Sequence, residues 1–269
     1  MKSTQGVASG PISFAEVFNA ATETVKQGSK RRGANMGVLR VDHPDIREFI
    51  TAKSDPNRFN NFNFSVALTD KFMEHVRNPA LGGGFYHLID PVTGEKAGVE
   101  KALEIMDMIV DGAWSNGEPG VLFIDAANRA NPTPHLGEYE STNPCGELWL
   151  LPHESCNLGS INLGRFVKAS QVDWDRLEKV VQVAVRFLDN VIDCNKYPIP
   201  ETEEMTKKTR KIGLGIMGLH DMLIQLDRVY GSEEGRQVAV EVMCFIKEVA
   251  HKTSRALGKE KCAFWGGAG

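Results

Sequence analysis

Short apolar runs alternate with longer amphipathic patterns along this chain, and that alternation limits its possible folds more than any other feature. Four short runs have the length and composition of strands: Gly37–Val41, Phe62–Leu68, Phe85–Asp90 and Gly120–Ile124. Apolar residues recur at helical spacing in Phe14–Val25, Val99–Trp114, Trp174–Asp193 and Gln237–Ala256, and a further helix starts at His43–Asp45. Strands that alternate with helices are typical of parallel sheets covered by helices. The pattern predicts an α/β architecture in one domain or part of one.

Two of these helices have features that predict where they begin and which face they bury. Ser13 and Glu16 match a capping box, which predicts a helix that begins at Ser13. The spacing predicts an apolar face in that helix made of Phe14, Val17, Phe18, Ala21 and Val25. In Val99–Trp114 it predicts buried side chains at Leu103, Met106, Ile109 and Val110.

Charge and hydropathy exclude several classes of protein. The formal net charge is −4, from 31 basic and 35 acidic residues, without the basic excess of a nucleic-acid-binding surface. No apolar run approaches the roughly 20 residues that span a bilayer. Met1–Gly10 lacks the apolar segment of a secretory signal. We therefore expect a cytoplasmic protein that binds neither nucleic acid nor membrane.

The five cysteines show no metal-binding pattern. Neither a CxxC pair nor a Cys/His ligand spacing occurs, so we expect no metal site. In a cytosolic chain most cysteines pack as small apolar side chains, and any other role depends on the neighbouring residues.

The segment Ser141–Glu147 is chemically the most informative. It places an amide, a thiol and a carboxylate at alternate positions, on Asn143, Cys145 and Glu147. In an extended loop these three side chains would point to the same side. The acidic neighbour disfavours a nucleophilic thiolate, and it favours a neutral thiol that gives up a hydrogen atom beside a general base. A buried packing cysteine next to a solvated glutamate is the alternative that spacing alone leaves open.

The run Gly213–Gly218 fits the GxGxxG pattern of dinucleotide-binding proteins, such as NAD-dependent oxidoreductases. That fingerprint requires a hydrophobic strand before the first glycine. The basic stretch Lys207–Lys211 stands there instead, which makes dinucleotide binding a weak hypothesis.

Residues 138–163 resemble the finger loop of ribonucleotide reductase large subunits, with continuous matches over Glu138–Glu147 and Leu151–Leu163. The resemblance covers nearly the whole chain, at Ser3–Pro11, Lys30–Gly37, His43–Ile46, Asn61–Val66, Asn131–Glu138 and Arg210–Gly218. The motif Pro144–Glu147, followed by Cys156 with ten residues between Cys145 and Cys156, is most similar to that of the adenosylcobalamin-dependent class.

The resemblance implies a fold and an activity. The fold would be part of an α/β barrel with a central finger loop. The activity would be reduction of ribonucleotides to 2′-deoxyribonucleotides for DNA synthesis, of the ribonucleoside-diphosphate reductase type, with adenosylcobalamin as cofactor. Cys145 matches the cysteine whose thiyl radical takes the 3′ hydrogen of the substrate. Glu147 matches the base for the 3′-hydroxyl, Asn143 the amide that binds the substrate next to Pro144, and Cys156 one of two reducing cysteines.

The resemblance also implies regulatory and redox partners. Residues 1–40 would form the end of an effector-binding region and a specificity loop, with Gln27, Lys30, Arg31 and Arg32 as contacts for a deoxynucleotide effector. Amide and guanidinium groups suit the recognition of bases and phosphates. A solvated basic turn is the alternative for these four residues. A thioredoxin-like protein would reduce the disulfide after turnover.

We also expect the chain to be an internal piece of a longer protein. The family's upstream partner of Cys156, several later barrel strands and the C-terminal cysteines have no counterpart, and the match is lost after Lys261. The isolated piece would then be inactive unless a second chain supplied the missing barrel segments. The alternative function is a catalytically incomplete piece that only binds nucleotide or a partner subunit.

Overall fold

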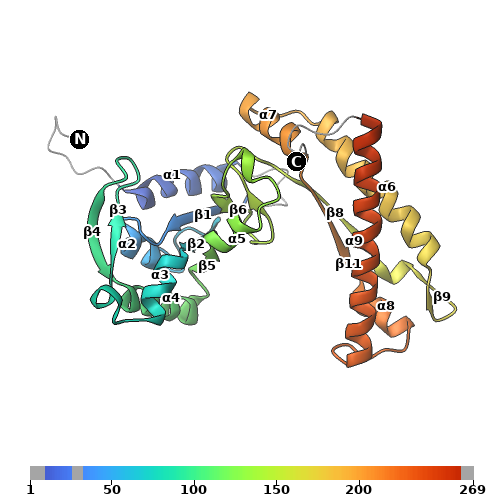
Figure 1. Cartoon of the computed structure of the whole chain (residues 1–269), viewed down its shortest axis with the longest axis horizontal. Helices are drawn as coiled ribbons and strands as arrows, with labels where there is room; N and C mark the ends of the chain where they lie inside the picture. Colours follow the sequence, from blue (N-terminus) through green and yellow to red (C-terminus); the bar gives the residue numbers. More distant parts are fainter. Residues whose placement is uncertain (1–9, 26–32, 262–269) are drawn as a thin grey trace. The chain divides into compact units, whose positions relative to one another are not determined.

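In the computed structural model, which describes residues 10–25 and 33–261, the chain forms two compact units (Figure 1). The first unit comprises Met1–Leu151 and the second Pro152–Gly269. Each has its own parallel strands and its own hydrophobic core.

The first unit alternates strands and helices in the way the sequence predicts. Its longer elements are α1 (Pro11–Thr24), β1 (Asn35–Arg40), α2 (Ile46–Thr51), β2 (Phe62–Leu68), α3 (Asp70–Arg77), β3 (Phe85–Ile89), β4 (Lys96–Lys101), α4 (Ala102–Asn116), β5 (Gly120–Phe123) and α5 (Ile124–Arg129). The short strands β6 (Ser141–Thr142) and β7 (Trp149–Leu150) follow. One-turn 3₁₀ helices occupy Leu81–Gly84 and Pro134–Leu136.

The sheet of this unit is parallel, with β2 between β1 and β5. Asn35 pairs with Phe62 on one side of β2, and Leu68 pairs with Phe123 on the other. Helices connect the strands, as parallel pairing requires. All of β2 is buried except Asn63, because a central parallel strand is covered on both faces. The four strands predicted for this unit are confirmed.

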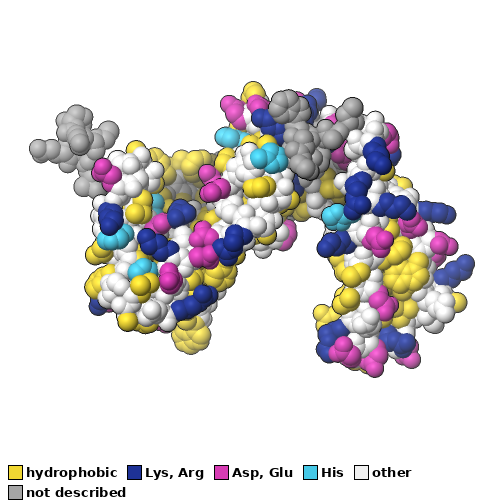
Figure 2. All heavy atoms as spheres, in the orientation of Figure 1, with side chains coloured by type: hydrophobic (Ala, Val, Ile, Leu, Met, Phe, Trp, Pro, Cys, Tyr) yellow, Lys and Arg dark blue, Asp and Glu magenta, His cyan; other side chains and the backbone are white. Residues whose placement is uncertain are grey.

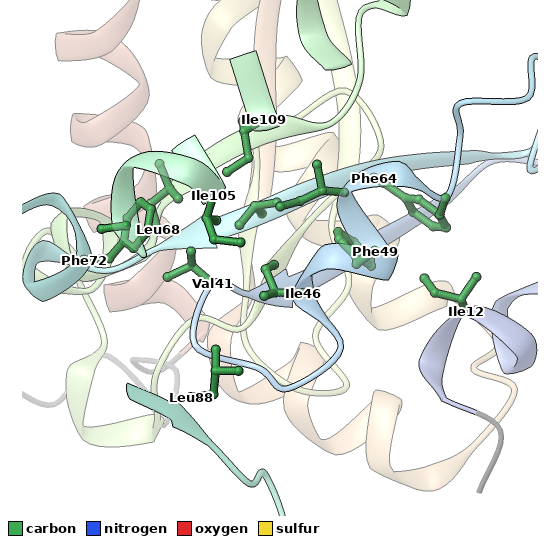
Figure 3. Packing of buried hydrophobic residues seen from close by; sticks show 14 of the residues in the cluster. Ile12, Val41, Ile46, Phe49, Phe64, Leu68, Phe72, Leu88, Ile105 and Ile109 are labelled. Carbon is green, nitrogen blue, oxygen red and sulfur yellow. The ribbon is translucent and has the colours of Figure 1, made fainter. Parts of the chain in front are cut away.

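The core of the first unit lies between the sheet and its helices (Figure 3). Ile46 and Phe49 of α2 and Ile105 and Ile109 of α4 are buried against it. The rings of Phe49 and Phe64 stack with centroids 4.8 Å apart. Side chains of this size each contribute about 1.5–3 kcal/mol on burial, so this cluster is the main stabilising feature of the unit.

Two predicted details of the first helix are wrong. The first helix begins at Pro11 with Gly10 as N-cap, so Ser13 is not a capping residue; Pro in the first turn is itself a strong start signal. Of the apolar side chains in α1, Ile12 is buried, whereas Phe14, Val17 and Phe18 are exposed.

The fourth helix also differs from its prediction. Val99 belongs to the hairpin strand β4, where it pairs with His87, and α4 starts only at Ala102. The buried face of α4 is Ala102, Ile105 and Ile109, while Leu103 and Val110 are exposed. Cross-strand pairing with β3 took the first residues of the predicted helix, because tertiary contacts override local propensity.

The second unit is built on two long helices and one pair of parallel strands. Its elements are β8 (Asn157–Asn162), β9 (Val167–Lys168), β10 (Gln171–Val172), α6 (Trp174–Cys194), α7 (Pro200–Thr209), β11 (Ile212–Met217), α8 (Leu219–Gln225) and α9 (Glu233–Lys261). A 3₁₀ turn lies at Leu163–Arg165. The predicted helices Trp174–Asp193 and Gln237–Ala256 are confirmed, the latter with longer ends.

The glycine-rich run forms strand β11, which pairs in parallel with β8. A Cβ atom at Gly213 would lie 2.3 Å from Cδ2 of Leu158, so the close approach of the two strands requires glycine there. Gly213 and Gly215 lie inside β11, and Gly218 alone stands at the junction with α8. The run therefore does not form the glycine-rich strand-to-helix loop of the dinucleotide-binding fingerprint.

The core of the second unit joins the two strands to α6, α8 and α9. Leu177 and Val181 of α6, Met222 of α8 and Val242 of α9 are fully buried. Both units also expose large apolar side chains, such as Phe187 on α6 and Val240 on α9. Figure 2 shows hydrophobic side chains in yellow on one face of the molecule. None of the helices in the described ranges combines the length and apolar character needed to cross a membrane.

Both units confirm the predicted α/β class. Each unit has parallel strands connected by helices. The described strands close into a barrel in neither unit, since the parallel sheet has three strands in the first unit and two in the second.

Candidate functional site

Cys145 lies at the turn of a short antiparallel hairpin formed by β6 and β7. Asn143 organises this turn. Its backbone N–H donates to the carbonyl of Leu148 (3.2 Å), its Oδ1 accepts from the Leu148 N–H (3.1 Å), and its carbonyl accepts from the Gly146 N–H (2.9 Å). Gly146 has φ of 85°, a conformation that favours glycine. The Pro-Cys-Gly sequence therefore folds into a tight, internally bonded turn.

This turn corrects the expectation of an extended loop. The alternation argument placed Asn143, Cys145 and Glu147 on one side, which holds only for extended backbone. The bond from Gly146 N–H to Asn143 O reverses the chain between them. Cys145 and Glu147 are both exposed, so the alternative of a buried packing cysteine is also wrong for Cys145.

The turn borders a pocket of about 380 Å³ over the parallel sheet of the first unit. Pro144, Cys145 and Gly146 line one side, and residues of β1, β2 and β5 line another. Asn143 and Glu147 are not among the lining residues. Ligand pockets are on the order of 300–1,000 Å³, so this one has room for a small ligand beside the thiol.

Sequence reasoning missed two residues of this pocket region. Asn63 on β2 donates from Nδ2 to the carbonyl of Pro144 (2.6 Å), which ties the turn to the sheet. Glu118 lines the pocket and binds Lys53 Nζ through Oε1 (2.5 Å) and the Phe64 N–H through Oε2 (3.0 Å). Asn63 is a polar residue next to two phenylalanines in β2, and it is the one exposed residue of that strand. Its polar character within an apolar strand is the signal that the sequence offered.

The base of the hairpin is held by aromatic packing. The rings of Tyr139 and Trp149 lie 6.0 Å apart, and Tyr139 is buried. Such a pair contributes about 0.5–1.5 kcal/mol beyond its burial. Trp149 is therefore a packing residue of the hairpin.

Cys156 belongs to the second unit, directly before strand β8. Its side chain is half-buried, and its Sγ lies 3.3 Å from the carbonyl of Asn157. Glu154, two residues earlier, has a fully buried side chain in an ion pair with Lys211 (2.6 Å). The sequence led us to expect that most cysteines, Cys194 and Cys244 among them, pack as apolar side chains. Both are exposed, on α6 and α9, so that expectation is wrong for them.

Gln27, Lys30, Arg31 and Arg32 lie outside the described residues. Over residues 10–25 and 33–261, no group of three or more His, Cys, Asp and Glu side chains is arranged to hold a metal ion.

Comparison with known proteins gives a consistent family. Residues 1–266 match the family described as ribonucleotide reductase, barrel domain. The chain is 49% identical over 264 residues to the vitamin B12-dependent ribonucleoside-diphosphate reductase of Thermoplasma acidophilum, covering 97% of this chain and 34% of that protein. It is 49% identical over 263 residues to the enzyme of the same name from Mycobacterium tuberculosis (strain CDC 1551 / Oshkosh), covering 97% and 37%.

A more distant relative has a different name. The ribonucleoside-diphosphate reductase subunit alpha of Chlamydia pneumoniae is 30% identical over 292 residues, with 97% of this chain and 28% of that protein covered. The chain thus spans roughly a third of the length of the relatives it matches. Since the family match covers nearly all of its residues, this chain belongs to the ribonucleotide reductase barrel-domain family.

Proposed function

We propose that the chain supplies the radical-bearing loop and one reducing thiol of an enzyme that reduces ribonucleoside diphosphates to 2′-deoxyribonucleotides. The observation that carries the proposal is the exposed thiol of Cys145 on a rigid turn beside a pocket. A hydrogen-atom transfer requires the two reacting atoms in contact, and a preorganised turn supplies that geometry.

In the proposed reaction, the Cys145 thiyl takes the 3′ hydrogen of the substrate and becomes a thiol, and it gives a hydrogen atom back to C3′ at the end, which regenerates the thiyl. Glu147 takes the 3′-hydroxyl proton, and the 2′-hydroxyl leaves as water. Oδ1 of Asn143 already accepts a bond within the turn, so Asn143 would bind a substrate oxygen through Nδ2. Pro144 lines the pocket and would contact the ribose. Cys156, with a second thiol, would supply two electrons and two protons as the pair becomes a disulfide.

Adenosylcobalamin is proposed as the cofactor because the relatives at 49% identity are named as vitamin B12-dependent. The pocket formed by the described residues is too small to hold adenosylcobalamin. A pocket of about 380 Å³ has the size of a small ligand, and a corrinoid is several times larger. We therefore assign no residue of this chain to corrinoid binding and no reaction step to the cofactor.

The remaining partners are proposed at the level of the family. A deoxynucleotide effector would contact Gln27, Lys30, Arg31 and Arg32, and residues 1–40 would belong to the effector region. A thioredoxin-like protein would reduce the disulfide. A further polypeptide segment or second chain would complete the barrel, since relatives are about three times longer. The reaction would take place in the cytoplasm.

A chimera tests the proposed function. Residues 1–266 replace the matching segment of the Thermoplasma acidophilum relative, and deoxynucleotide formation is followed with adenosylcobalamin, a ribonucleoside diphosphate, effectors and dithiothreitol. We expect turnover within about tenfold of the parent, since half of the positions are identical. The Cys145→Ser chimera provides the matched control.

A folded chimera that makes no product, while the parent enzyme does, would contradict the proposal. It would favour the alternative in which the chain only binds nucleotide or a partner subunit. Equilibrium binding of the ribonucleoside diphosphate to the same chimera then measures whether nucleotide binding persists without catalysis.

A further inference from the structure

Three side chains that flank Cys156 are each bound to a different element of the second unit. Glu154 pairs with Lys211 at the start of β11 (2.6 Å), and the Ser155 hydroxyl bonds that of Thr206 on α7 (2.8 Å). Asn157 Nδ2 donates to the carbonyl of Leu188 on α6 (3.2 Å). The residues before and after the thiol are therefore fixed from three directions.

The parallel register brings Lys211 close to the thiol along the chain. Ile212 and Asn157 form the first pair of β11 and β8, so Lys211 and Cys156 are the residues directly before that pair. A Cβ atom at Gly213 would lie 3.7 Å from the Cys156 sulfur, in ordinary contact. The thiol thus lies against the start of the strand that carries Lys211.

The ion pair of Glu154 and Lys211 is unusual in its burial. The Glu154 side chain is 0% exposed and that of Lys211 is 17% exposed. Desolvation of two such charges offsets most of their attraction, and apolar residues of similar size often stabilise a fold as well. Stability alone is therefore a weak explanation for an ion pair at this position, and a local effect on the neighbouring thiol is a better one.

We propose that Glu154 and Lys211, with Thr206, are positioning residues that hold the Cys156 thiol and set the charge around it. This inference rests on the proposed role of Cys156 as a reducing thiol. A sulfur atom that forms and breaks a disulfide must meet its partner at about 2.05 Å with a restricted dihedral angle, so its position has to be fixed. Glu154 and Lys211 carry opposite charges, so substitution of either one changes the charge near the thiol.

Several other charged side chains on the elements packed around this site are paired with one another. On α6, Asp189 and Asp193 bind Arg210, which ends α7, and both also bind Lys261 of α9. On α7 itself, Lys207 pairs with Glu203 and Lys208 with Glu204. His153 precedes Glu154 in the chain. Removal of one partner from the Glu154–Lys211 pair is therefore the direct way to unbalance the charge at Cys156.

The test is the pH dependence of Cys156 alkylation in the full chain, with iodoacetamide as probe and each cysteine quantified by peptide mass spectrometry. Only the thiolate reacts, so the pH of half-maximal rate reports the charge around the sulfur. Glu154→Gln removes the carboxylate that pairs with the Lys211 ammonium and should lower that pH by about half a unit or more. Lys211→Met removes the ammonium that pairs with the Glu154 carboxylate and should raise that pH by a similar amount.

Three further variants separate positioning from general loosening. The neutral double variant Glu154→Gln/Lys211→Met should return the midpoint to that of the parent, and the conservative Lys211→Arg should not move it. Glu203→Gln, which removes an exposed ion pair on α7, is the matched control and should change nothing. Cys194 and Cys244, exposed in the same unit, are internal references with constant rates.

Shifts of the same sign in both single variants, or no shift in either, would overturn the proposal, because loosening alone exposes the thiol without regard to charge sign. If a single-charge variant does not fold, Thr206→Val tests the hydroxyl contact with little change in volume. It should raise the Cys156 rate severalfold at an unchanged midpoint, and an unchanged rate would overturn the proposal.

The alkylation measurement requires no turnover. Opposite shifts in an inactive chimera would leave the positioning pair intact and reject only the reductase function. An active chimera in which neither variant shifts the alkylation midpoint would support the reductase function and reject the positioning role of Glu154 and Lys211.

Discussion

The two cysteines that the family resemblance singles out have opposite surroundings. Cys145 is exposed at a hairpin turn whose shape comes from the backbone and the Asn143 side chain, with one tether from Asn63. Cys156 is half-buried, and its neighbours in the chain are bound by side chains to α6, α7 and β11.

The difference matches the two chemical tasks proposed for them. A thiol that exchanges a hydrogen atom with a substrate must be reachable, so it lies at a pocket border on a short, stiff turn. A thiol that forms a disulfide must keep one position relative to another sulfur, so its surroundings are fixed by long-range contacts. The predictions that follow test this contrast, from the largest expected effect to the smallest.

The largest effect is expected from Cys145→Ser. In the chimera it should lower deoxynucleotide formation by about 10⁴-fold or more, because no other group can carry the radical. Cys156→Ser should also stop multiple turnover, yet it should retain loss of deuterium from a 3′-deuterated substrate, which Cys145→Ser should not. Mass spectrometry of recovered substrate measures this exchange. Equal loss of deuterium in the Cys145→Ser and Cys156→Ser variants would mean that the two thiols do not have separate roles. Cys194→Ser is the control, and it should leave product formation unchanged.

A large effect on stability is expected from Glu154→Gln. Loss of one partner of a buried ion pair costs about 3 kcal/mol or more, whereas Glu203→Gln in an exposed pair costs about 0.5 kcal/mol or less. Native-state hydrogen exchange of the β8 and β11 amides measures the local free energy of opening. Similar values in both variants would mean that the Glu154–Lys211 pair does not hold the two strands together.

A smaller effect is expected from Asn63→Ala, which frees the Pro144 carbonyl from its tether. Because Asn63 is exposed, stability should change by less than about 0.5 kcal/mol. Displacement of the turn should lower kcat/KM of the chimera by about tenfold. Asn60→Ala, an exposed residue that bonds only within its own loop, is the matched control. Equal activity in the two variants would show that the hairpin holds Cys145 without the tether.

The smallest effect concerns acid stability of the second unit. Hydrogen bonds from Arg210 lower the pKa of Asp193 from 3.8 to about 2. The carboxylate therefore contributes fully above pH 3.8, and its contribution is lost as the pH falls from about 4 to about 2. Since Asp193 is 45% exposed, solvent screening limits the contribution to about 1 kcal/mol.

Urea unfolding of the full chain at several pH values measures this slope. Asp193→Asn should flatten it between pH 4 and pH 2 by the same small amount. A slope that the substitution leaves unchanged would mean that other carboxylates dominate acid unfolding.

Local patterns predicted most of the long elements. The strand Phe62–Leu68 and the helix Trp174–Asp193 follow from composition and periodicity, because a strand or helix that packs on one core repeats its apolar residues accordingly. The start of α4 was misread because β4 takes the first residues of the predicted helix into a hairpin; Ile109 is buried as predicted, whereas Leu103 and Val110 are exposed. Phe14, Val17 and Phe18 of α1 are exposed although they lie at helical spacing. Apolar residues at that spacing indicate a helix face suited to burial, but they do not indicate which element covers that face.

The chain's sequence by itself determined the α/β alternation, the family and the identity of the thiol, amide and carboxylate around Cys145. Only the tertiary structure decided that these residues form a tight turn, that Asn63 bonds that turn while Glu118 lines the pocket beside it, and that Lys211 meets Glu154. The partners of these contacts lie 81 residues apart for Asn63 and Pro144 and 57 apart for Lys211 and Glu154. Periodicity reports the environment of one element, whereas such contacts depend on the register between strands, which no local pattern encodes.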